Sequence, residues 1–306
     1  MKSAGRSSIR SASSSNTSAS TDAAPEVALT FDDLPVHGPL PGTVTREDIA
    51  NSIIHALQAA NVPPTYGFVN AQRIQEDHST EQVLKLWRNA GFPLGNHTFS
   101  HMDLNSNTTE AFEKDLEADE PILKKYMDDR DYRWLRFPFL HEGVNPAQHK
   151  EIEDYLKKRG YKVAEVTLSF GDYLYNEPYA RCVAKNDMQA IDWMKKSYLD
   201  GSIADLDHAE LVSKLVYGRD IKHVMLLHIG GFDAIMIPDL IKTLKQHGVK
   251  LISLQDAESD PAYATSAQLP GVWQGTFLQQ MMVERHITPP PGGGENVGAK
   301  LAGLCR

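Results

Sequence analysis

The first apolar run of the chain has the pattern of a buried strand. In residues 27–33, Val-Ala-Leu-Thr-Phe-Asp-Asp, large apolar side chains alternate with smaller ones and the run ends in two carboxylates. Such alternation is typical of a strand, because successive side chains of a strand point to opposite faces. The pattern therefore predicts a strand whose end delivers both carboxylates to one rim of the fold.

The pattern then changes to that of a helix. Residues 34–42 contain several Pro and Gly residues, which cannot sustain regular structure, so we expect a loop at the rim. The apolar residues between 49 and 57 recur at helical spacing, and Thr45 lies three residues before Asp48, as in a capping box. A helix is therefore expected to follow the first strand.

Strand-like and helix-like segments alternate along most of the remaining chain. Strands are expected near residues 65–69, 133–139, 161–168, 223–228 and 249–254. Helices are expected near residues 80–90, 108–127, 146–158, 187–199, 207–217 and 234–247. Regular alternation implies parallel strands joined by helical crossovers, and about seven such units favour an α/β fold of the distorted (β/α)7 barrel type. The reactive residues of such a barrel lie at the carboxyl ends of its strands.

The two ends of the chain lack this alternation. Residues 1–26 are rich in Ser, Ala, Thr and Asn without an apolar segment, so we expect a disordered leader and see no intact secretory signal. Residues 259–306 break up into Pro, Gly and short apolar pieces, which predicts an irregular C-terminal extension. The catalytic barrel is accordingly expected at residues 27–258.

Charge and hydropathy narrow the classes of function. The formal net charge of −9 argues against a nucleic-acid partner, because binding to the phosphate backbone depends on clustered Lys and Arg. The longest apolar stretch, 224–238, is interrupted by His228 and Asp233 and falls short of the roughly 20 residues that span a membrane. Cys182 and Cys305 could pair in an oxidising compartment or be two unrelated thiols. The sequence leaves the oligomeric state open.

The residues best suited to chemistry are an acidic pair and two histidines. Asp32 and Asp33 end the first strand, and His97 and His101 are four residues apart. We expect the histidines on one face of a helical turn, where both imidazoles can reach one ion. Two His and one carboxylate leave positions open for water and substrate, as in a catalytic metal site. Zinc is the expected ion, and cobalt, nickel or manganese would suit the same ligands.

Four short motifs, in order within residues 27–255, resemble those of the polysaccharide deacetylases, the NodB-like group that forms carbohydrate esterase family 4. The motifs are Thr30-Phe31-Asp32-Asp33, His97-Thr98-Phe99-Ser100-His101, Arg136-Phe137-Pro138-Phe139 and Leu226-Leu227-His228. The resemblance implies the NodB homology fold and a metal-dependent deacetylase.

The resemblance also implies roles for the residues around the metal. Asp32 would be the general base, and Asp33, His97 and His101 would be the metal ligands. Arg136 would hold the Asp32 carboxylate in place.

On the substrate side, His228 would be the general acid and Leu226 would line the pocket for the acyl methyl group. The backbone N–H near Phe139 would face the oxyanion.

The chain departs from the family in the fourth motif, where an Asp followed by Trp is usual and this sequence has Asp172-Tyr173. Asp172 can still orient His228 and stabilise its charged form. By the same resemblance, Tyr173 in place of the Trp would alter the shape of the floor of the substrate pocket. His37, in the loop after the first strand, could contact substrate or be solvated.

The expected function is removal of acetyl groups from a carbohydrate, with the N-acetyl group of an amino sugar as the first choice. The alternatives are an O-acetyl (acetylxylan-type) esterase, a hydrolase of a non-sugar amide or cyclic imide, and a non-catalytic glycan-binding protein. The resemblance suggests a periplasmic or extracellular location.

Overall fold

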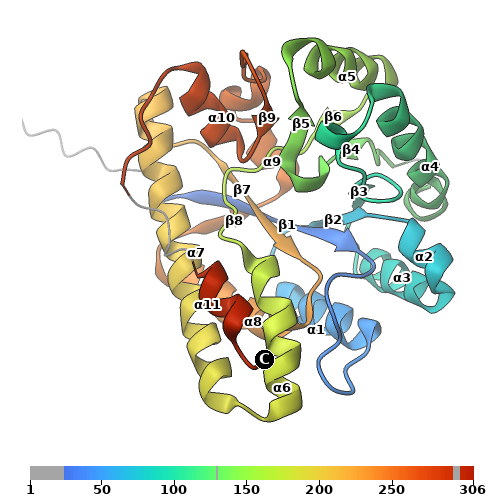
Figure 1. Ribbon diagram of the computed structural model, residues 1–306, viewed down its shortest axis with the longest axis vertical. Helices are drawn as coiled ribbons and strands as arrows, with labels where there is room; N and C mark the ends of the chain where they lie inside the picture. The colour runs from blue at the N-terminus through green and yellow to red at the C-terminus, as the bar shows by residue number, and fades with distance from the viewer. Residues whose placement is uncertain (1–23, 129, 292–296) are drawn as a thin grey trace, which may run out of the picture.

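The computed structural model describes residues 24–128, 130–291 and 297–306 (Figure 1). The leader expected at residues 1–26 lies almost entirely outside these residues.

Parallel strands form one curled, seven-stranded sheet in the middle of the molecule (Figure 1). The order along the sheet is β6 (Lys162–Val163), β4 (Trp134–Leu135), β3 (Leu94–Asn96), β2 (Tyr66–Val69), β1 (Glu26–Leu34) and β7 (His223–His228), and β8 (Lys250–Ile252) pairs with the start of β1. The chain after β6 returns to β7, where Leu168 forms a parallel bridge with Met225. The distorted (β/α)7-type barrel is therefore confirmed.

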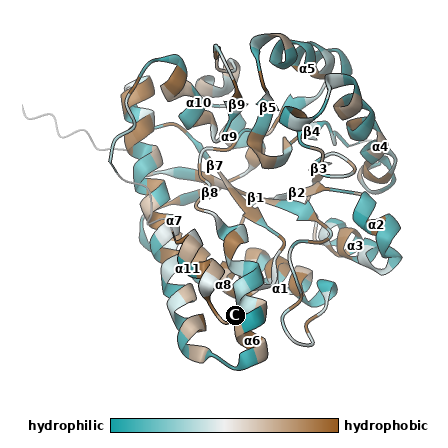
Figure 2. Ribbon diagram, in the orientation of Figure 1, coloured by the Kyte–Doolittle hydropathy of each residue, from teal (hydrophilic) through white to brown (hydrophobic). Residues whose placement is uncertain are grey.

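Helices surround this sheet, and α1 packs beside both α8 and α3. Their bounds are α1 Arg46–Ala59, α2 Gln72–Glu76, α3 Glu81–Asn89, α4 Thr109–Met127, α5 Pro146–Arg159, α6 Asn176–Lys185, α7 Met188–Tyr217, α8 Gly231–Gln246, α9 Leu254–Glu258, α10 Phe277–Glu284 and α11 Gly298–Gly303. Figure 2 shows that these helices carry both hydrophobic and hydrophilic residues, as expected of helices with one buried side. In the part of the chain that the structure describes, no helix is long and apolar enough to cross a membrane.

Strand β1 shows how the alternating pattern builds two packing faces. Val27, Leu29 and Phe31 belong to the large core cluster that includes the helices, whereas Ala28 belongs to a separate cluster with Tyr66 of β2. Alternate residues of β1 therefore face the helices and the inside of the curl.

The start of α1 is also as predicted. The Thr45 side chain accepts a hydrogen bond from the backbone N–H of Asp48, and the Asp48 carboxylate accepts one from the Thr45 backbone, which completes the capping box.

The helices expected at 187–199 and 207–217 are in fact one helix, α7. The polar residues between the two predicted segments do not break it, because Ser202 is fully buried and donates a hydrogen bond to the carbonyl of Leu199 within the helix. Buried Leu206 continues the apolar side of the helix through the same region. The preceding helix, α6, was not predicted.

Two strands are shorter than expected. The segment 133–139 contains only β4, because Pro138 starts a 3₁₀ turn (η3, Pro138–Leu140) and Phe139 adopts φ 61°. The segment 161–168 divides between two neighbours, with β6 beside β4 and Leu168 beside β7. The local sequence at Pro138 thus ends the first of these strands, whereas the curl of the sheet divides the second segment.

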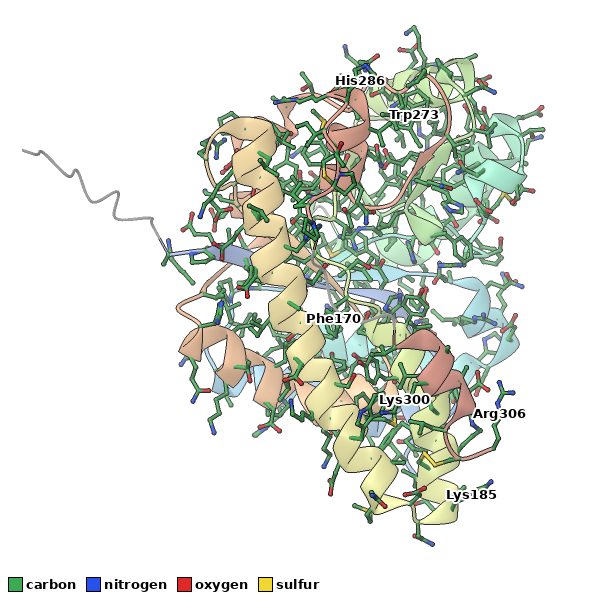
Figure 3. All side chains as sticks on the ribbon, turned by 60° about the vertical axis from the view of Figure 1, so that its left-hand side comes forward. Phe170, Lys185, Trp273, His286, Lys300 and Arg306 are labelled. Atoms are coloured by element: carbon green, nitrogen blue, oxygen red, sulfur yellow. A yellow bond between two sulfur atoms is a disulfide. The ribbon has the colours of Figure 1, made fainter. Side chains whose placement is uncertain are left out.

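The described residues of the C-terminal segment pack against the barrel. Strand β9 (Trp273–Gln274) pairs antiparallel with β5 (His141–Gly143), and the Trp273 side chain is almost completely buried. Cys182 and Cys305 form a disulfide, which decides between the two possibilities left by the sequence. Figure 3 shows Trp273 at one end of the molecule and Arg306 toward the other.

Candidate active site

The acidic pair reaches the pocket through an irregular strand end. The pairing between β1 and β2 shifts register between Phe31 and Leu34, and Asp33 adopts φ 66°. In a regular strand two consecutive side chains would point to opposite faces. The irregularity instead lets Asp32 and Asp33 line the same pocket.

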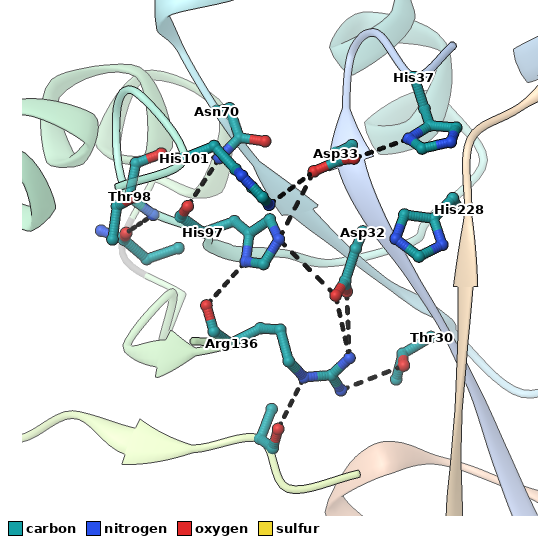
Figure 4. A network of polar contacts seen from close by, with 12 residues as sticks. Thr30, Asp32, Asp33, His37, Asn70, His97, Thr98, His101, Arg136 and His228 are labelled. Atoms are coloured by element: carbon teal, nitrogen blue, oxygen red, sulfur yellow. Dashed lines mark hydrogen bonds and ion pairs between the residues drawn. The ribbon is translucent and has the colours of Figure 1, made fainter. Parts of the chain in front are cut away.

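The helical turn expected at His97–His101 is wrong. The segment is a loop after β3, and Thr98 and His101 have φ of 59° and 60°, which an α-helix does not allow. Asn70 holds the loop by donating hydrogen bonds from Nδ2 to the carbonyls of His97 (2.6 Å) and Thr98 (2.8 Å). The two imidazoles nevertheless converge, as Figure 4 shows.

Three side chains are arranged as a ligand set. Asp33 Oδ1 lies 3.5 Å from His97 Nε2 and 3.4 Å from His101 Nε2. Four ligands placed tetrahedrally at metal bonds of about 2.0–2.1 Å would be separated by about 3.3 Å, so these distances match the edges of such a site. Asp33 Oδ1 is buried and has no hydrogen-bond partner among the described residues. These features fit a divalent cation.

The remaining atoms of the set are held by other groups. His97 Nδ1 donates to the carbonyl of Arg136 (2.7 Å), which leaves the lone pair on Nε2 directed at the cluster. His37 Nδ1 donates to Asp33 Oδ2 (2.7 Å). Asp33, His37 and His228 also form a group with metal-ligand spacing, but this hydrogen bond already engages the Asp33 oxygen nearest His37. The Asp33, His97 and His101 set is therefore the better ligand group.

The charge states of the set suit a cation. Burial alone would raise the pKa of Asp33, but the hydrogen bond from His37 and the nearby histidine charges hold that pKa well below its ordinary value. Burial, assisted by the neighbouring His97, lowers the pKa of His101 to about 4. Near pH 7 the set thus offers a carboxylate and a neutral imidazole, the forms that bind metals.

Asp32 is held by a buried arginine. Arg136 Nη1 lies 3.1 Å and 3.3 Å from the two Asp32 oxygens, and both side chains are almost fully buried. The other nitrogens of the guanidinium donate to Thr30 Oγ1 (3.2 Å) and to the carbonyl of Ala164 (2.7 Å). Because every branch of Arg136 is engaged, the Asp32 carboxylate has a fixed position and a compensated charge.

His228 forms a similar pair with Asp172. The Asp172 carboxylate accepts hydrogen bonds from the His228 backbone N–H (2.7 Å) and from Nδ1 (3.1 Å). Burial alone would lower the pKa of His228, but the Asp172 charge and hydrogen bond raise it to about 10. The contact with Asp172 leaves Nε2 as the ring nitrogen available to the pocket.

These groups share one cavity of about 610 Å³. The nine predicted residues that line it are Asp32, Asp33, His37, His97, His101, Phe139, Tyr173, Leu226 and His228. Arg136 and Asp172 lie behind the wall, where they contact Asp32 and His228.

Two predicted substrate contacts form aromatic surfaces beside this chemistry. Phe139 is 58% exposed and packs edge-on against His101, with ring centroids 4.5 Å apart. Tyr173 is 47% exposed and lies edge-on to His228 at 5.4 Å. Both rings are therefore accessible to a molecule in the cavity.

Part of the wall of this cavity was not predicted from the sequence. Gly275, Thr276 and Gln279 also line it. Thr276 and Gln279 have the three-residue spacing of a capping box, which could have indicated the start of a helix. No local signal, however, could have placed that helix beside residues more than 40 positions earlier in the chain.

Comparison with known proteins agrees with this site. Residues 19–164 match the family model described as polysaccharide deacetylase, and this part of the chain contains the acidic pair, both histidines and Arg136. This part of the chain, slightly less than half of it, is therefore similar to the polysaccharide deacetylase family. This similarity supports carbohydrate deacetylation as the class of reaction. Among curated proteins, none has a matching sequence.

Solved structures share the fold. A chitin deacetylase from Colletotrichum lindemuthianum is 20% identical, with 78% of this chain and 89% of that chain covered and a TM-score of 0.51. A mutant of a carbohydrate esterase family 4 pseudoenzyme from Bacillus anthracis, with restored enzymatic activity, is 15% identical over 76% of this chain and 67% of that one, with a TM-score of 0.50. The peptidoglycan deacetylase PdaC from Bacillus subtilis is 22% identical, with 77% and 90% covered and a TM-score of 0.49.

Proposed function

We propose that the protein is a metal-dependent hydrolase that removes N-acetyl groups from an amino sugar of a carbohydrate. The observation that carries this proposal is the single cavity that combines the ligand set of Asp33, His97 and His101 with Asp32 and His228. A pure glycan-binding protein needs no fixed carboxylate and imidazole beside such a set. The arrangement therefore favours catalysis over a non-catalytic role.

The Asp33, His97 and His101 side chains would hold one divalent ion. Zinc is the expected ion because two imidazoles and one carboxylate suit it, although cobalt, nickel and manganese accept the same ligands. When bound, the ion would polarise the acetyl carbonyl and lower the pKa of a water molecule.

Asp32 would act as the general base. Its carboxylate, held by Arg136, would accept a proton from water as the water oxygen bonds to the carbonyl carbon. The backbone N–H near Phe139 would donate to the carbonyl oxygen as negative charge develops on it.

His228 would act as the general acid. With Nδ1 held by Asp172, it would donate the proton on Nε2 to the nitrogen of the leaving group as the C–N bond breaks. The products are acetate and a free amine, and no oxidant or reductant is needed. Leu226, which lines the cavity, would contact the acetyl methyl group.

The His228–Asp172 pair favours N-deacetylation over O-deacetylation. An amine is a poor leaving group and must be protonated, whereas an alkoxide leaves more readily. A histidine held by a buried carboxylate matches the harder reaction. Hydrolysis of a non-sugar amide or cyclic imide would use the same residues and is distinguished by substrate.

The direct test is acetate release from N-acetylglucosamine oligomers, acetylated xylo-oligomers and small aryl acetates. The proposal expects the N-acetylated oligomers to be the best substrates. It also expects a chelator to abolish the activity and added zinc to restore it. Activity that survives complete removal of metal would exclude the metal-dependent reaction.

The Asp32→Asn variant tests the base. We expect kcat to fall by about 10²–10⁴-fold, the usual contribution of general base catalysis. Zinc content should be unchanged, because Asp32 is not in the ligand set. Full turnover with bound zinc would show that another group removes the proton.

We further propose a periplasmic or extracellular location. The Cys182–Cys305 disulfide supports this, because disulfides persist mainly in oxidising compartments. Fractionation of the native host, with thiol labelling of each fraction, would test it.

A further inference from the structure

The C-terminal segment supplies part of the catalytic cavity. Gly275, Thr276 and Gln279 line the cavity that contains the ligand set. They lie more than 100 residues beyond the end of the 19–164 match to the family model. The match to the family model therefore assigns no role to these three residues.

This wall is attached firmly to the barrel. Strand β9, which leads into it, pairs with β5, the strand that follows Phe139 and includes pocket-lining His141. Asn105 joins the two strands by donating to the carbonyl of Trp273 (3.1 Å) and accepting from the N–H of Gly143 (2.8 Å). Beyond the wall, the Phe277 N–H donates to the carbonyl of Val166 (2.8 Å).

The orientation of the Gln279 amide is fixed. Its Oε1 accepts a hydrogen bond from the Thr276 backbone N–H (2.9 Å), as part of the capping box that begins α10. The amide cannot be reversed, because Nε2 would then face another N–H. Gly275 makes room for this contact, since a Cβ there would collide with Gln279 Oε1.

One polar group remains available on this wall. With Oε1 engaged, Gln279 presents the two N–H groups of Nε2, for which no hydrogen bond to another described residue is seen. The side chain is exposed and lines the cavity. A neutral N–H donor suits a neutral oxygen acceptor, such as the hydroxyl or acetamido oxygen of a sugar.

We infer that Gln279 is a specificity-determining residue, whose Nε2 donates a hydrogen bond to an oxygen of the bound sugar across the cavity from the metal ligands. This inference rests on the proposed function, because it concerns the substrate of the same site. It assigns to the C-terminal segment the selection of sugar substrates over small acetates.

The test is the Gln279→Glu variant. Glu is the other residue that completes a capping box at this position, so one carboxylate oxygen can still accept from the Thr276 N–H and α10 should be retained. The other carboxylate oxygen takes the place of Nε2, so a charged acceptor replaces the neutral N–H donor. We expect KM for N-acetylglucosamine oligomers to rise by about tenfold or more with kcat nearly unchanged, the signature of lost uniform binding. Activity on a small aryl acetate, which does not reach Gln279, should fall much less than activity on the oligomers.

Gln274→Glu is the matched control. It introduces the same charge on β9 at an exposed residue that does not line the cavity. We expect wild-type constants from this variant. An unchanged KM in Gln279→Glu, or an equal loss on oligomers and aryl acetate, would overturn the inference.

Failure of the proposed function gives a different result. If the wild-type protein releases no acetate from any substrate, the proposed reaction is wrong, and calorimetric binding of the same oligomers then tests Gln279. Weaker binding by Gln279→Glu than by wild type and Gln274→Glu would support the inference. Equal binding, or no binding by wild type, would overturn it.

Discussion

Residues with uncommon backbone conformations assemble the candidate site. Asp33, Thr98, His101 and Phe139 all have φ near +60°. Each such conformation costs about 1–3 kcal/mol for a residue other than Gly, so it persists only where the surroundings enforce it. Here the enforcing groups include Asn70, which binds the histidine loop. Such strained residues cluster at functional sites, which agrees with the proposed role of this pocket.

The His37→Ala variant tests whether His37 holds the metal ligand Asp33 in place. Because His37 donates to Asp33 Oδ2, we expect His37→Ala to weaken zinc binding by about 10–100-fold, as is typical for a group that orients a metal ligand. Competition with a chromogenic chelator measures the affinity. His141→Ala is the control, because His141 lines the same cavity but binds Asp103. Zinc affinity equal in all three proteins would contradict the prediction.

The Asp172→Asn variant tests whether His228 is the general acid. The Asp172 carboxylate raises the pKa of His228 because it stabilises the imidazolium. In Asp172→Asn the amide oxygen can still accept from Nδ1, but the negative charge is gone. His228 would then lose its proton at a lower pH, and the alkaline limb of the kcat profile should move to lower pH by about one unit or more. An unmoved alkaline limb would show that His228 is not the acid.

At the scale of elements, the site is built by the segments that follow the strands rather than by the strands alone. Asp32 and Asp33 end β1, the histidine loop follows β3, and His228 ends β7. The placements at the ends of β1 and β7 were predictable from the sequence because apolar periodicity marks where strands end, whereas no strand was expected before the histidine loop. The contribution of β9 and α10 was not predictable, because their neighbours are decided by pairing with β5, far away in the chain.

The Gly275→Ala variant tests whether the turn between β9 and α10 requires a glycine. Gly275 has φ +82°, and a Cβ would collide with Gln279 Oε1, so we expect Gly275→Ala to lower the free energy of unfolding by about 1–3 kcal/mol. Denaturant titration provides the measurement. Gly271→Ala is the matched control, because Gly271 has no such φ and no atom within 4 Å of an added Cβ. Equal stabilities of the two variants would refute this account of the turn.

At the scale of the whole molecule, the curled sheet and the C-terminal segment enclose the pocket together. The disulfide joins residues 123 positions apart and ties the chain end to α6. Helix α11 also packs against η4 (Asp172–Tyr175), which carries Asp172 and Tyr173. The end of the chain therefore supports an element of the site.

Reduction of the disulfide should lower the stability of the whole protein. Removing a crosslink that closes so long a loop is expected to cost about 2–5 kcal/mol of unfolding free energy. A reductant should produce this loss in the wild type and have no effect on a Cys182→Ser, Cys305→Ser double variant, which should already be less stable. Denaturant curves with and without reductant check both expectations. A reductant-insensitive wild type would contradict them.

The alternation of strands and helices, the parallel barrel and the residue types of the ligand set could all be predicted from the sequence, because periodicity and motif spacing are local properties. These local properties did not predict the backbone that joins His97 to His101, the division of residues 161–168 between β4 and β7, or the wall formed by Gly275, Thr276 and Gln279. Those features depend on contacts between distant segments. Only the closure of the sheet, and the pairing of β9 with β5, brings such segments together.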